Sequence, residues 1–324
     1  MKSLEGTIAL VAGATRGAGR GIAVALGEAG ATVYCTGRST RGKPITKKRK
    51  VSSVFQTEGR PETIDETAEM VNAHGGKGIA VQTDHTDEQQ VKKLFARIKR
   101  EQGGLDILVN DIWGGDSLTE WGKPFWKLDL NKGFAMMQRA IFSHIITSRY
   151  GVPLMLGRPG GLLVEITDGN QAYYRGTLFY DFVKMSVIRL AFAMAHELKG
   201  KRITALAVTP GFLRSETMLE HFGVTEQNWR EGAKKDPNFI ASESPMFVGR
   251  AIAALAADRN VFSKSGKVFS SWQLSDEYGF TDADGQRPHW GRYIHSSKNK
   301  ALIAFQKEFS ASHHAYLQAF SESV

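Results

Sequence analysis

The stretch Gly13-Ala14-Thr15-Arg16-Gly17-Ala18-Gly19 follows the apolar run 8–12 and leads directly into a second apolar run, 22–26. Glycine lets a backbone approach a ligand closely, and the first turn of a helix offers free N–H groups and the positive end of its dipole. A strand that turns through three glycines into a helix therefore predicts a phosphate-binding loop, with a nucleotide as the first ligand to consider. The spacing, Gly-x-x-x-Gly-x-Gly, is one residue wider at its front than the usual dinucleotide fingerprint. The alternative is a tight turn that needs glycine only for a positive φ.

Strand-like and helix-like segments alternate along the rest of the chain. Apolar runs typical of strands lie at 7–12, 31–36, 78–82, 105–110, 161–166 and 203–208, with a seventh, edge strand expected at 267–270. Amphipathic stretches typical of helices lie at 61–74, 87–102, 128–149 and 180–199. This alternation predicts an α/β fold, a Rossmann-type doubly wound parallel sheet of about seven strands with helices on both faces. Ligands bind beyond the carboxyl ends of the strands in such sheets.

The composition predicts a protein of the cytoplasm. The 324 residues, 42% of them hydrophobic, can form one large domain or two small ones, and no break in composition separates two halves. No apolar run is long enough to span a bilayer, and residues 1–6 lack the apolar core of a signal peptide. The lone cysteine, Cys35, lies in the apolar run 31–35, so we expect a buried strand residue and no internal disulfide.

A tyrosine and a lysine four residues apart are the first candidates for chemistry. Tyr180 and Lys184 open a long helical pattern, so their side chains lie on one face, about a turn apart. A nearby ammonium favours the phenolate, which brings the phenol within reach of acid–base work at neutral pH. The pair could pass a proton to or from an alcohol or carbonyl oxygen. Taken alone, it could equally be an ordinary pair on a partly exposed helix.

Together these motifs resemble the short-chain dehydrogenase/reductase family in its classical form, over residues 5 to about 270. The resemblance rests on the glycine turn, on Tyr180-x-x-x-Lys184, on Asn131 within 130–133, and on the post-strand segment Pro210-Gly211-Phe212-Leu213-Arg214-Ser215. It implies that Tyr180 is the general acid in reduction and that Lys184 lowers its pKa and holds the nicotinamide ribose. It also implies that Asn131 anchors a water that relays protons.

Two positions depart from the family pattern. The residue thirteen before the tyrosine is Thr167 rather than serine; its hydroxyl could still polarise a substrate carbonyl, or it could be only a strand-end residue. After the fourth strand the chain reads Asn110-Asp111-Ile112-Trp113-Gly114-Gly115 in place of Asn-Asn-Ala-Gly. Asn110 can tie neighbouring strands. The two glycines that follow either restore a close approach to the cofactor or leave cofactor binding altered, and we expect the first.

The second strand favours NADP(H) over NAD(H). It ends in Thr36-Gly37-Arg38-Ser39, without the acidic residue that binds the ribose hydroxyls of NAD, so Arg38 and Ser39 can bind a 2′-phosphate, with Arg16 on its other side. Asp84-His85 resembles the family's adenine-contacting position. The expected cofactor-binding residues are Gly13, Thr15, Arg16, Gly17, Gly19, Arg38, Ser39, Asp84, His85, Asn110, Tyr180, Lys184, Pro210, Gly211, Phe212 and Ser215.

The resemblance implies an NADPH-dependent carbonyl reductase or alcohol dehydrogenase that acts on an apolar or cyclic substrate. Trp113, Tyr173, Phe179 and Phe212 are the expected pocket residues. Enoyl reduction is a rival, but Thr177 stands where those enzymes usually carry tyrosine. A third possibility is a catalytically weak NADP-sensing regulator that binds nucleic acid through the basic loop 41–50, although no aromatic residue interleaves its run of lysines and arginines.

Residues 1–270 are expected to form the catalytic domain, with a basic insertion at 38–60 that contributes much of the net charge of +9. Residues 271–324 are expected to be a C-terminal extension packed on the same domain or on a neighbouring subunit. Family members assemble as dimers or tetramers, so we expect a homodimer or homotetramer built through 128–149 and 180–199. No metal site is expected, because the histidines lack ligand spacing.

Overall fold

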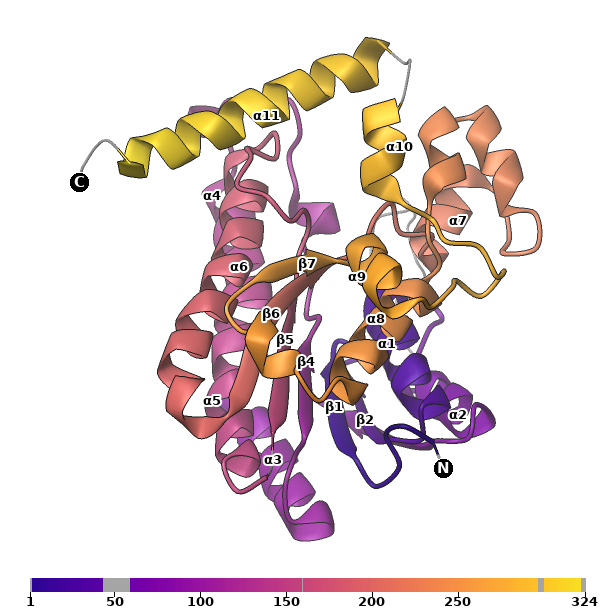
Figure 1. Cartoon of the computed structure of the whole chain (residues 1–324), viewed down its shortest axis with the longest axis vertical. Coiled ribbons are helices and arrows are strands. Elements are labelled where there is room, and N and C mark those ends of the chain that lie inside the picture. Colours follow the sequence, from indigo (N-terminus) through magenta and orange to yellow (C-terminus); the bar gives the residue numbers. More distant parts are fainter. Residues whose placement is uncertain (1, 43–58, 159, 297–299, 322–324) are drawn as a thin grey trace.

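Seven parallel strands form one sheet with helices on both faces. The computed structural model describes residues 2–42, 59–158, 160–296 and 300–321 (Figure 1). The strands are β1 (Ile8–Ala12), β2 (Thr32–Gly37), β3 (Lys77–Gln82), β4 (Ile107–Asn110), β5 (Gly161–Ile166), β6 (Ile203–Thr209) and β7 (Val268–Ser270), in the order β3-β2-β1-β4-β5-β6-β7. The strand order reverses its direction between β1 and β4, which is where this kind of sheet binds ligands. The predicted Rossmann-type fold is confirmed.

Two layers of helices enclose the sheet. The helices are α1 (Gly17–Glu28), α2 (Ile64–Ala73), α3 (Glu88–Gln102), α4 (Leu130–Met137), α5 (Ser143–Met155), α6 (Leu178–Leu198), α7 (Glu216–Phe222), α8 (Pro245–Ala257), α9 (Ser271–Tyr278), α10 (Trp290–Ser296) and α11 (Lys300–Ser321). Figure 1 shows α1, α2 and α8 on one face of the sheet and α3, α5 and α6 on the other. The predicted helix 180–199 begins two residues earlier than expected, at Leu178.

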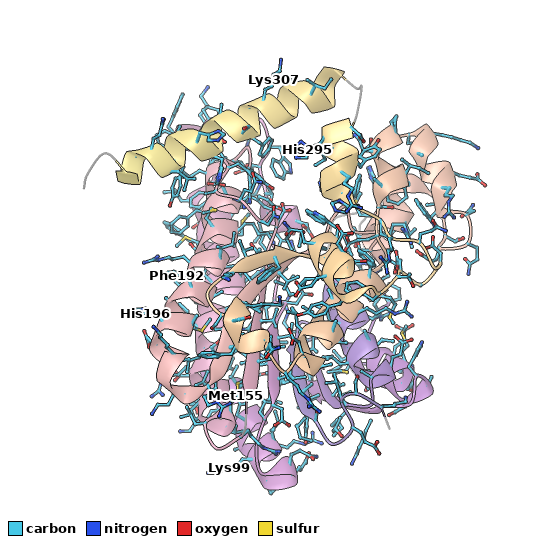
Figure 2. The ribbon with its side chains drawn as sticks, in the orientation of Figure 1. Lys99, Met155, Phe192, His196, His295 and Lys307 are labelled. Atoms are coloured by element: carbon cyan, nitrogen blue, oxygen red, sulfur yellow. The ribbon has the colours of Figure 1, made fainter. Side chains whose placement is uncertain are left out.

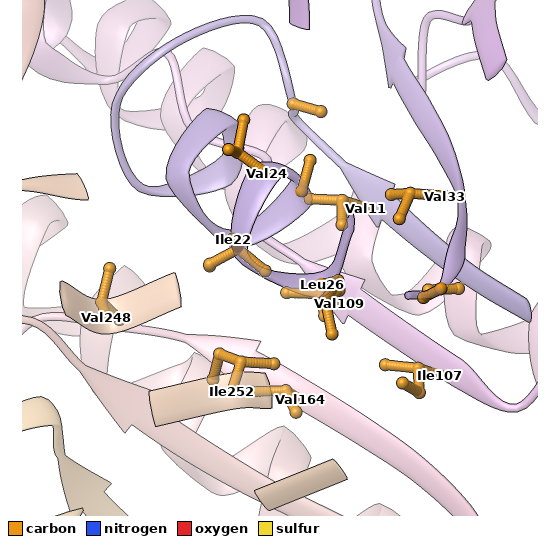
Figure 3. Packing of buried hydrophobic residues seen from close by; sticks show 14 of the residues in the cluster. Val11, Ile22, Val24, Leu26, Val33, Ile107, Val109, Val164, Val248 and Ile252 are labelled. Carbon is orange, nitrogen blue, oxygen red and sulfur yellow. The ribbon is translucent and has the colours of Figure 1, made fainter. Parts of the chain in front are cut away.

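Successive residues of the central strands pack into different cores. Val11 of β1 joins the core under α1 and α8, where it packs with Ile22 and Val248 (Figure 3). Its neighbour Leu10 joins the opposite core, which includes residues of α3 and α5. Alternate side chains of a strand point to opposite faces, so a strand buried on both faces must be apolar throughout. Cys35 of β2 is buried in the first core, where burial raises the pKa of its thiol to about 12.

The stretch 128–149, expected as a single helix, contains a wide turn. It consists of α4, a π turn (η3, Gln138–Phe142) and α5, which continues to Met155. A π turn adds residues to the helix without adding length, so side chains after it face a different direction than a continuous α-helix would give them. This change of phase decides which residues of the segment reach the site.

The segment after β7 packs against the same sheet and then crosses the top of the molecule. Ser270 caps α9 through a capping box with Gln273, and Leu274 of α9 is buried in the core under α1 and α8. Figure 1 shows α10 and α11 above the carboxyl ends of the strands. Among the described residues, no helix is long and apolar enough to cross a bilayer. Most of the predicted basic insertion, residues 43–58, lies outside the described residues.

Candidate active site

A cavity of about 1560 Å³ opens beyond the carboxyl ends of the strands. Residues that follow all seven strands line it, in keeping with the fold, and α10 and α11 add side chains from above, among them His295 (Figure 2). Of the residues expected from the sequence, the cavity wall includes Gly13, Thr15, Arg16, Gly17, Arg38, Ser39, Asp84, His85, Trp113, Thr167, Tyr173, Tyr180, Lys184, Pro210, Gly211, Phe212 and Ser215. Gly19, Asn110, Asn131 and Phe179 are not in this wall.

Two glycines of the turn are required by the packing of the protein itself. Gly13 has a φ of +96°, and a Cβ there would lie 2.3 Å from the carbonyl oxygen of Asp111. A Cβ on Gly19 would lie 2.4 Å from the carbonyl oxygen of Gly13. Only Gly17 has free space, with its nearest neighbour 3.8 Å away at Ser215. The turn therefore combines structural glycines with one glycine that exposes backbone to the cavity.

A carboxylate from α7 contacts the start of α1. The backbone N–H of Gly17 donates to Oε2 of Glu216 at 2.8 Å, and the other oxygen of Glu216 lies 3.5 Å from Nε of Arg20. Arg16, at the N-cap, makes no side-chain capping bond. The amide groups that the sequence assigns to phosphate are therefore in contact with an acidic side chain.

The proposed 2′-phosphate pocket contains an unsatisfied cation. Nε of Arg16 donates to Glu62 at 3.2 Å, but its Nη2 is buried and has no hydrogen-bond partner. Arg38 is exposed, and it and Ser39 also line the cavity. A buried guanidinium nitrogen without a partner is costly unless a ligand supplies an acceptor. These residues fit a phosphorylated dinucleotide.

Tyr180 and Lys184 lie within a group of aromatic and acidic side chains. The Tyr180 hydroxyl donates to Oδ2 of Asp168 at 2.7 Å, and its ring centroid lies 5.6 Å from that of Trp113 and 5.1 Å from that of Trp121. Nζ of Lys184 lies 3.8 Å from the Trp113 ring centroid, a cation–π contact. The indole that departs from the family pattern therefore covers the lysine.

Burial and Asp168 keep the Tyr180 hydroxyl protonated. Burial is the larger cause and the neighbouring carboxylate the second, and together they raise the pKa of Tyr180 well above its usual value. Burial likewise lowers the pKa of Lys184, although Asp168, Asp116 and Asp111 oppose this. The direction for Tyr180 is opposite to the lowering expected from Lys184, because a buried phenol beside a carboxylate favours its neutral form. The hydroxyl is therefore protonated at neutral pH and has a proton to donate, although the raised pKa makes it a weaker acid than an ordinary phenol.

Thr167 does not present its hydroxyl proton to the cavity as the sequence predicted. The Thr167 hydroxyl donates to the backbone oxygen of Lys184 at 2.8 Å, so its proton is engaged on α6. Asp168, the next residue, is the one whose side chain contacts Tyr180. Asn131 is exposed on the first turn of α4, whereas Arg139 and Ala140 in the π turn and His144 after it line the cavity. Phe179 packs against Phe134 instead, with ring centroids 6.3 Å apart.

Buried polar pairs hold the loops behind the site. Asn110 donates to Glu165 at 2.7 Å and to Ser148 at 3.0 Å, which ties β4 to β5 as expected. His144 lies 2.5 Å from Glu165, and although burial opposes the charged ring, this carboxylate raises the pKa of His144. Its other nitrogen lies 3.0 Å from the backbone oxygen of Ile112. This contact ties the loop after β4, which departs from the family pattern, to α5.

Two expected adenine contacts already have protein partners. Asp84 accepts from the backbone and hydroxyl of Thr86, at 3.0 and 2.7 Å. His85 is buried, with ring nitrogens 2.8 Å from Thr36 and from Thr147, and burial lowers its pKa to about 3. His85 is therefore neutral and holds the end of β3 against β2 and α5.

The segment Pro210-Gly211 rests on a buried acid. The N–H of Gly211 donates to Oε2 of Glu243 at 2.9 Å, and Ser271 donates to the same oxygen at 2.6 Å. Oε1 of Glu243 is buried with no hydrogen-bond partner. Burial raises the pKa of Glu243 to about 8.

Contacts of α11 close the upper wall of the cavity. The ring of Tyr173 lies 4.3 Å from that of Phe309, between centroids. The backbone N–H of Ala172 donates to Nδ1 of His313 at 3.1 Å. The loop that begins with Asp168 therefore touches the tail at its far end, a contact that no motif in the sequence indicated.

Comparison with known proteins agrees with this geometry. A family model described as short chain dehydrogenase matches residues 45–223. The chain is 33% identical over 288 residues to dehydrogenase/reductase SDR family member 1 of Mus musculus, covering 87% of this chain and 85% of that protein. It is 30% identical over 249 residues to a 3-oxoacyl-[acyl-carrier-protein] reductase of Vibrio harveyi, covering 74% and 88%. The fold resembles a crystal structure of a short chain dehydrogenase from Mycobacterium thermoresistibile, with a TM-score of 0.70 at 20% identity over 89% of this chain and 92% of the other.

Proposed function

Because this chain belongs to the short-chain dehydrogenase/reductase family, we propose that it is an NADPH-dependent oxidoreductase that interconverts a carbonyl and an alcohol on an apolar or cyclic substrate. Members of the family are oxidoreductases that use nicotinamide cofactors. The observation that carries the proposal is the Tyr180 hydroxyl, buried and protonated in the wall of the same cavity as the glycine turn and Arg16.

In the proposed reaction, side chains of this protein supply and accept the proton. A bound nicotinamide would supply the hydride in reduction or accept it in oxidation. Tyr180 would give its proton to the carbonyl oxygen, and Lys184, covered by Trp113, would hold the ribose and the charge left on the phenolate. The position of Thr167 supports a role in fixing α6 against β5 more than one in polarising a carbonyl. The exposed position of Asn131 gives its proposed water relay no support.

Preference for NADPH is supported by the cations at the end of β2. Arg16, Arg38 and Ser39 line the same cavity, and Nη2 of Arg16 is buried without a hydrogen-bond partner although its Nε pairs with Glu62. A 2′-phosphate would supply that acceptor and a charge-assisted hydrogen bond. NAD, whose ribose carries a hydroxyl there, would leave the guanidinium nitrogen unpaired.

Assembly as a homodimer or homotetramer is also proposed. Large apolar side chains are exposed on the two expected segments, at Phe134, Phe142, Ile145, Phe182 and Phe192. Contacts between subunits would remove these side chains from water. The regulator alternative lacks comparable support: Lys47–Lys50 lie outside the described residues, and Arg41 of the same loop pairs with Glu69.

A panel of ketones, aldehydes and alcohols, followed at the nicotinamide absorbance with NADPH and NADH in parallel, tests the proposal. We expect turnover of at least one carbonyl and a higher kcat/KM for NADPH than for NADH. Turnover only with enoyl substrates would replace carbonyl chemistry with the rival reaction. Equal kcat/KM for the two cofactors would remove the NADPH preference.

A further inference from the structure

Asp168 lines the same cavity as Tyr180 and contacts its hydroxyl. It follows β5 by two residues, lines the cavity, and accepts the Tyr180 hydroxyl proton at 2.7 Å. Its backbone oxygen accepts from Nε of the buried Arg175 at 2.7 Å, and Arg175 is itself paired with Asp181 at 3.1 Å. Within the described residues, its carboxylate forms no ion pair. Among the described residues the carboxylate of Asp168 is therefore held beside the reacting position without a direct ion pair, although it is near enough to Lys184 to oppose the lowering of the pKa of that ammonium.

This carboxylate restricts what can react at Tyr180. A general acid must come within about 3 Å of the oxygen it protonates. Because Asp168 Oδ2 already lies 2.7 Å from the Tyr180 hydroxyl, a carbonyl oxygen that takes over that proton lies within about 6 Å of the carboxylate. A carbonyl oxygen only accepts hydrogen bonds, so it removes the donor that Asp168 had and offers none in return. The displaced carboxylate would remain unpaired in the cavity wall, which is costly.

A substrate with its own donor avoids this cost. A hydroxyl on the carbon next to the carbonyl can point to Asp168 while the carbonyl oxygen takes the Tyr180 proton. The resulting hydrogen bond is charge-assisted and therefore strong. We infer that Asp168 is a specificity-determining residue that selects 2-hydroxy carbonyl substrates, reduced to vicinal diols, over carbonyls without an adjacent donor. In that reduction the carbonyl carbon receives a hydride from NADPH and its oxygen receives the Tyr180 proton. This inference rests on the proposed carbonyl chemistry.

Three aromatic ketones test it, because the cavity wall carries Trp113 and Trp121. 2-Hydroxy-1-phenylethanone carries the donor on the carbon next to the carbonyl. 2-Methoxy-1-phenylethanone keeps the oxygen but lacks the donor, and propiophenone has the size of the hydroxy ketone without the oxygen. We expect kcat/KM with NADPH to be about 10- to 100-fold higher for the hydroxy ketone than for either analogue, as for a hydrogen bond to a charged group. In Asp168→Asn and Asp168→Ser the kcat/KM values for the three ketones should fall within about 3-fold of one another, since the charge-assisted hydrogen bond is lost.

Asp116→Asn is the matched control. Asp116 also lines the cavity, and its carboxylate accepts from Nε1 of Trp113 at 2.7 Å, an interaction that asparagine can keep. The substitution Asp116→Asn removes one negative charge from the same wall and leaves Asp168 in place, so the preference for the hydroxy ketone should persist. Loss of the preference in Asp116→Asn would mean that general charge, not Asp168, selects the substrate.

Binding without turnover separates this inference from the proposed function. Calorimetric titration of the three ketones into the enzyme with NADP⁺, which cannot reduce them, should give a dissociation constant about 10-fold lower for the hydroxy ketone in the wild type only. Tighter binding of the hydroxy ketone with no NADPH oxidation overturns the proposed reaction and keeps the role of Asp168. Reduction of all three ketones with equal kcat/KM and equal affinity overturns the role of Asp168 and keeps the reaction.

Discussion

The carboxylate of Glu216 accepts a hydrogen bond from the backbone N–H of Gly17 at 2.8 Å, in the position where the sequence predicts a phosphate. A cofactor phosphate must displace it, because two anions cannot share one helix start. Glu216→Gln should therefore lower the dissociation constant of NADPH about 3- to 10-fold, in the range of one charge at a helix terminus. This dissociation constant is measured by titrating NADPH with the protein and following the NADPH fluorescence.

The exposed Glu231, which the cavity wall does not include, provides a control for loss of one negative charge. Glu231→Gln should leave the NADPH affinity unchanged. If Glu216→Gln binds NADPH more weakly than the wild type, the carboxylate supports the cofactor loop instead of competing with phosphate.

Removal of the Tyr180 hydroxyl should stop the chemistry and spare the cofactor. The buried, protonated phenol is the proposed acid, and loss of a positioned acid costs about 10²- to 10⁴-fold in rate. We expect Tyr180→Phe to lose at least about 10²-fold in kcat while NADPH affinity is retained. Stopped-flow single turnovers and NADPH titration measure both, and substantial residual turnover would contradict the mechanism.

The charge of Arg38, at the end of β2, should determine the preference for NADPH over NADH. Arg38 is exposed and lines the cavity, so Arg38→Asp replaces an attractive charge on the 2′-phosphate by a repulsive one. The KM for NADPH should rise far more than that for NADH, by about 10-fold or more, as expected when a charge-assisted bond is lost. Equal increases for the two cofactors would assign the 2′-phosphate to another position.

Glu243 should make stability depend on pH. Burial raises its pKa to about 8 in the folded protein, whereas an unfolded chain has a glutamate pKa of about 4.3. A raised folded pKa stabilises the protein below the unfolded value, and this stability is lost as the pH rises through about 8. Glu243→Gln does not titrate, so its melting temperature relative to the wild type should increase between pH 5 and pH 9. Thermal melts across that range measure it; parallel curves would show that Glu243 ionises at its ordinary pKa.

Contacts with α11 should affect substrate affinity more than chemistry. Phe309 packs on Tyr173, and His313 accepts from the backbone of Ala172, so both tail residues contact the loop after β5. Phe309→Ala should raise the KM for an aromatic ketone about 3- to 10-fold, the cost of one lost ring pair and part of its burial. The value of kcat should stay near that of the wild type. Tyr316, exposed on the same helix and absent from the cavity wall, offers the control Tyr316→Ala.

The fold could be predicted from the sequence because the central strands are buried on both faces. The run 8–12 is apolar without interruption, and in 161–166 the single charged residue, Glu165, is buried and hydrogen-bonded to Asn110. The rule that ligands bind at the carboxyl ends of the strands was sufficient to bring Gly17, Tyr180 and Lys184 to one cavity.

The individual side-chain contacts of the site could not be predicted, because they depend on the direction in which each side chain points. Thr167 and Asp168 are adjacent at the end of β5, and spacing alone does not say which of them turns to Tyr180. The family resemblance predicts a role for Asn131, but this residue is exposed on α4, and Arg139 in the π turn at Gln138–Phe142 lines the cavity. A wide turn changes helix phase and leaves no clear signal in the hydrophobic pattern.

The hydrogen bonds of Arg175 have a consequence for how this protein can evolve. Its buried guanidinium binds backbone oxygens of Asp168, Gln171 and Tyr173, which joins the loop into one unit that contacts Tyr180 at one end and α11 at the other. Mutations that accumulate in the tail can therefore shift the substrate range by moving this loop, while the residues that transfer the proton stay the same.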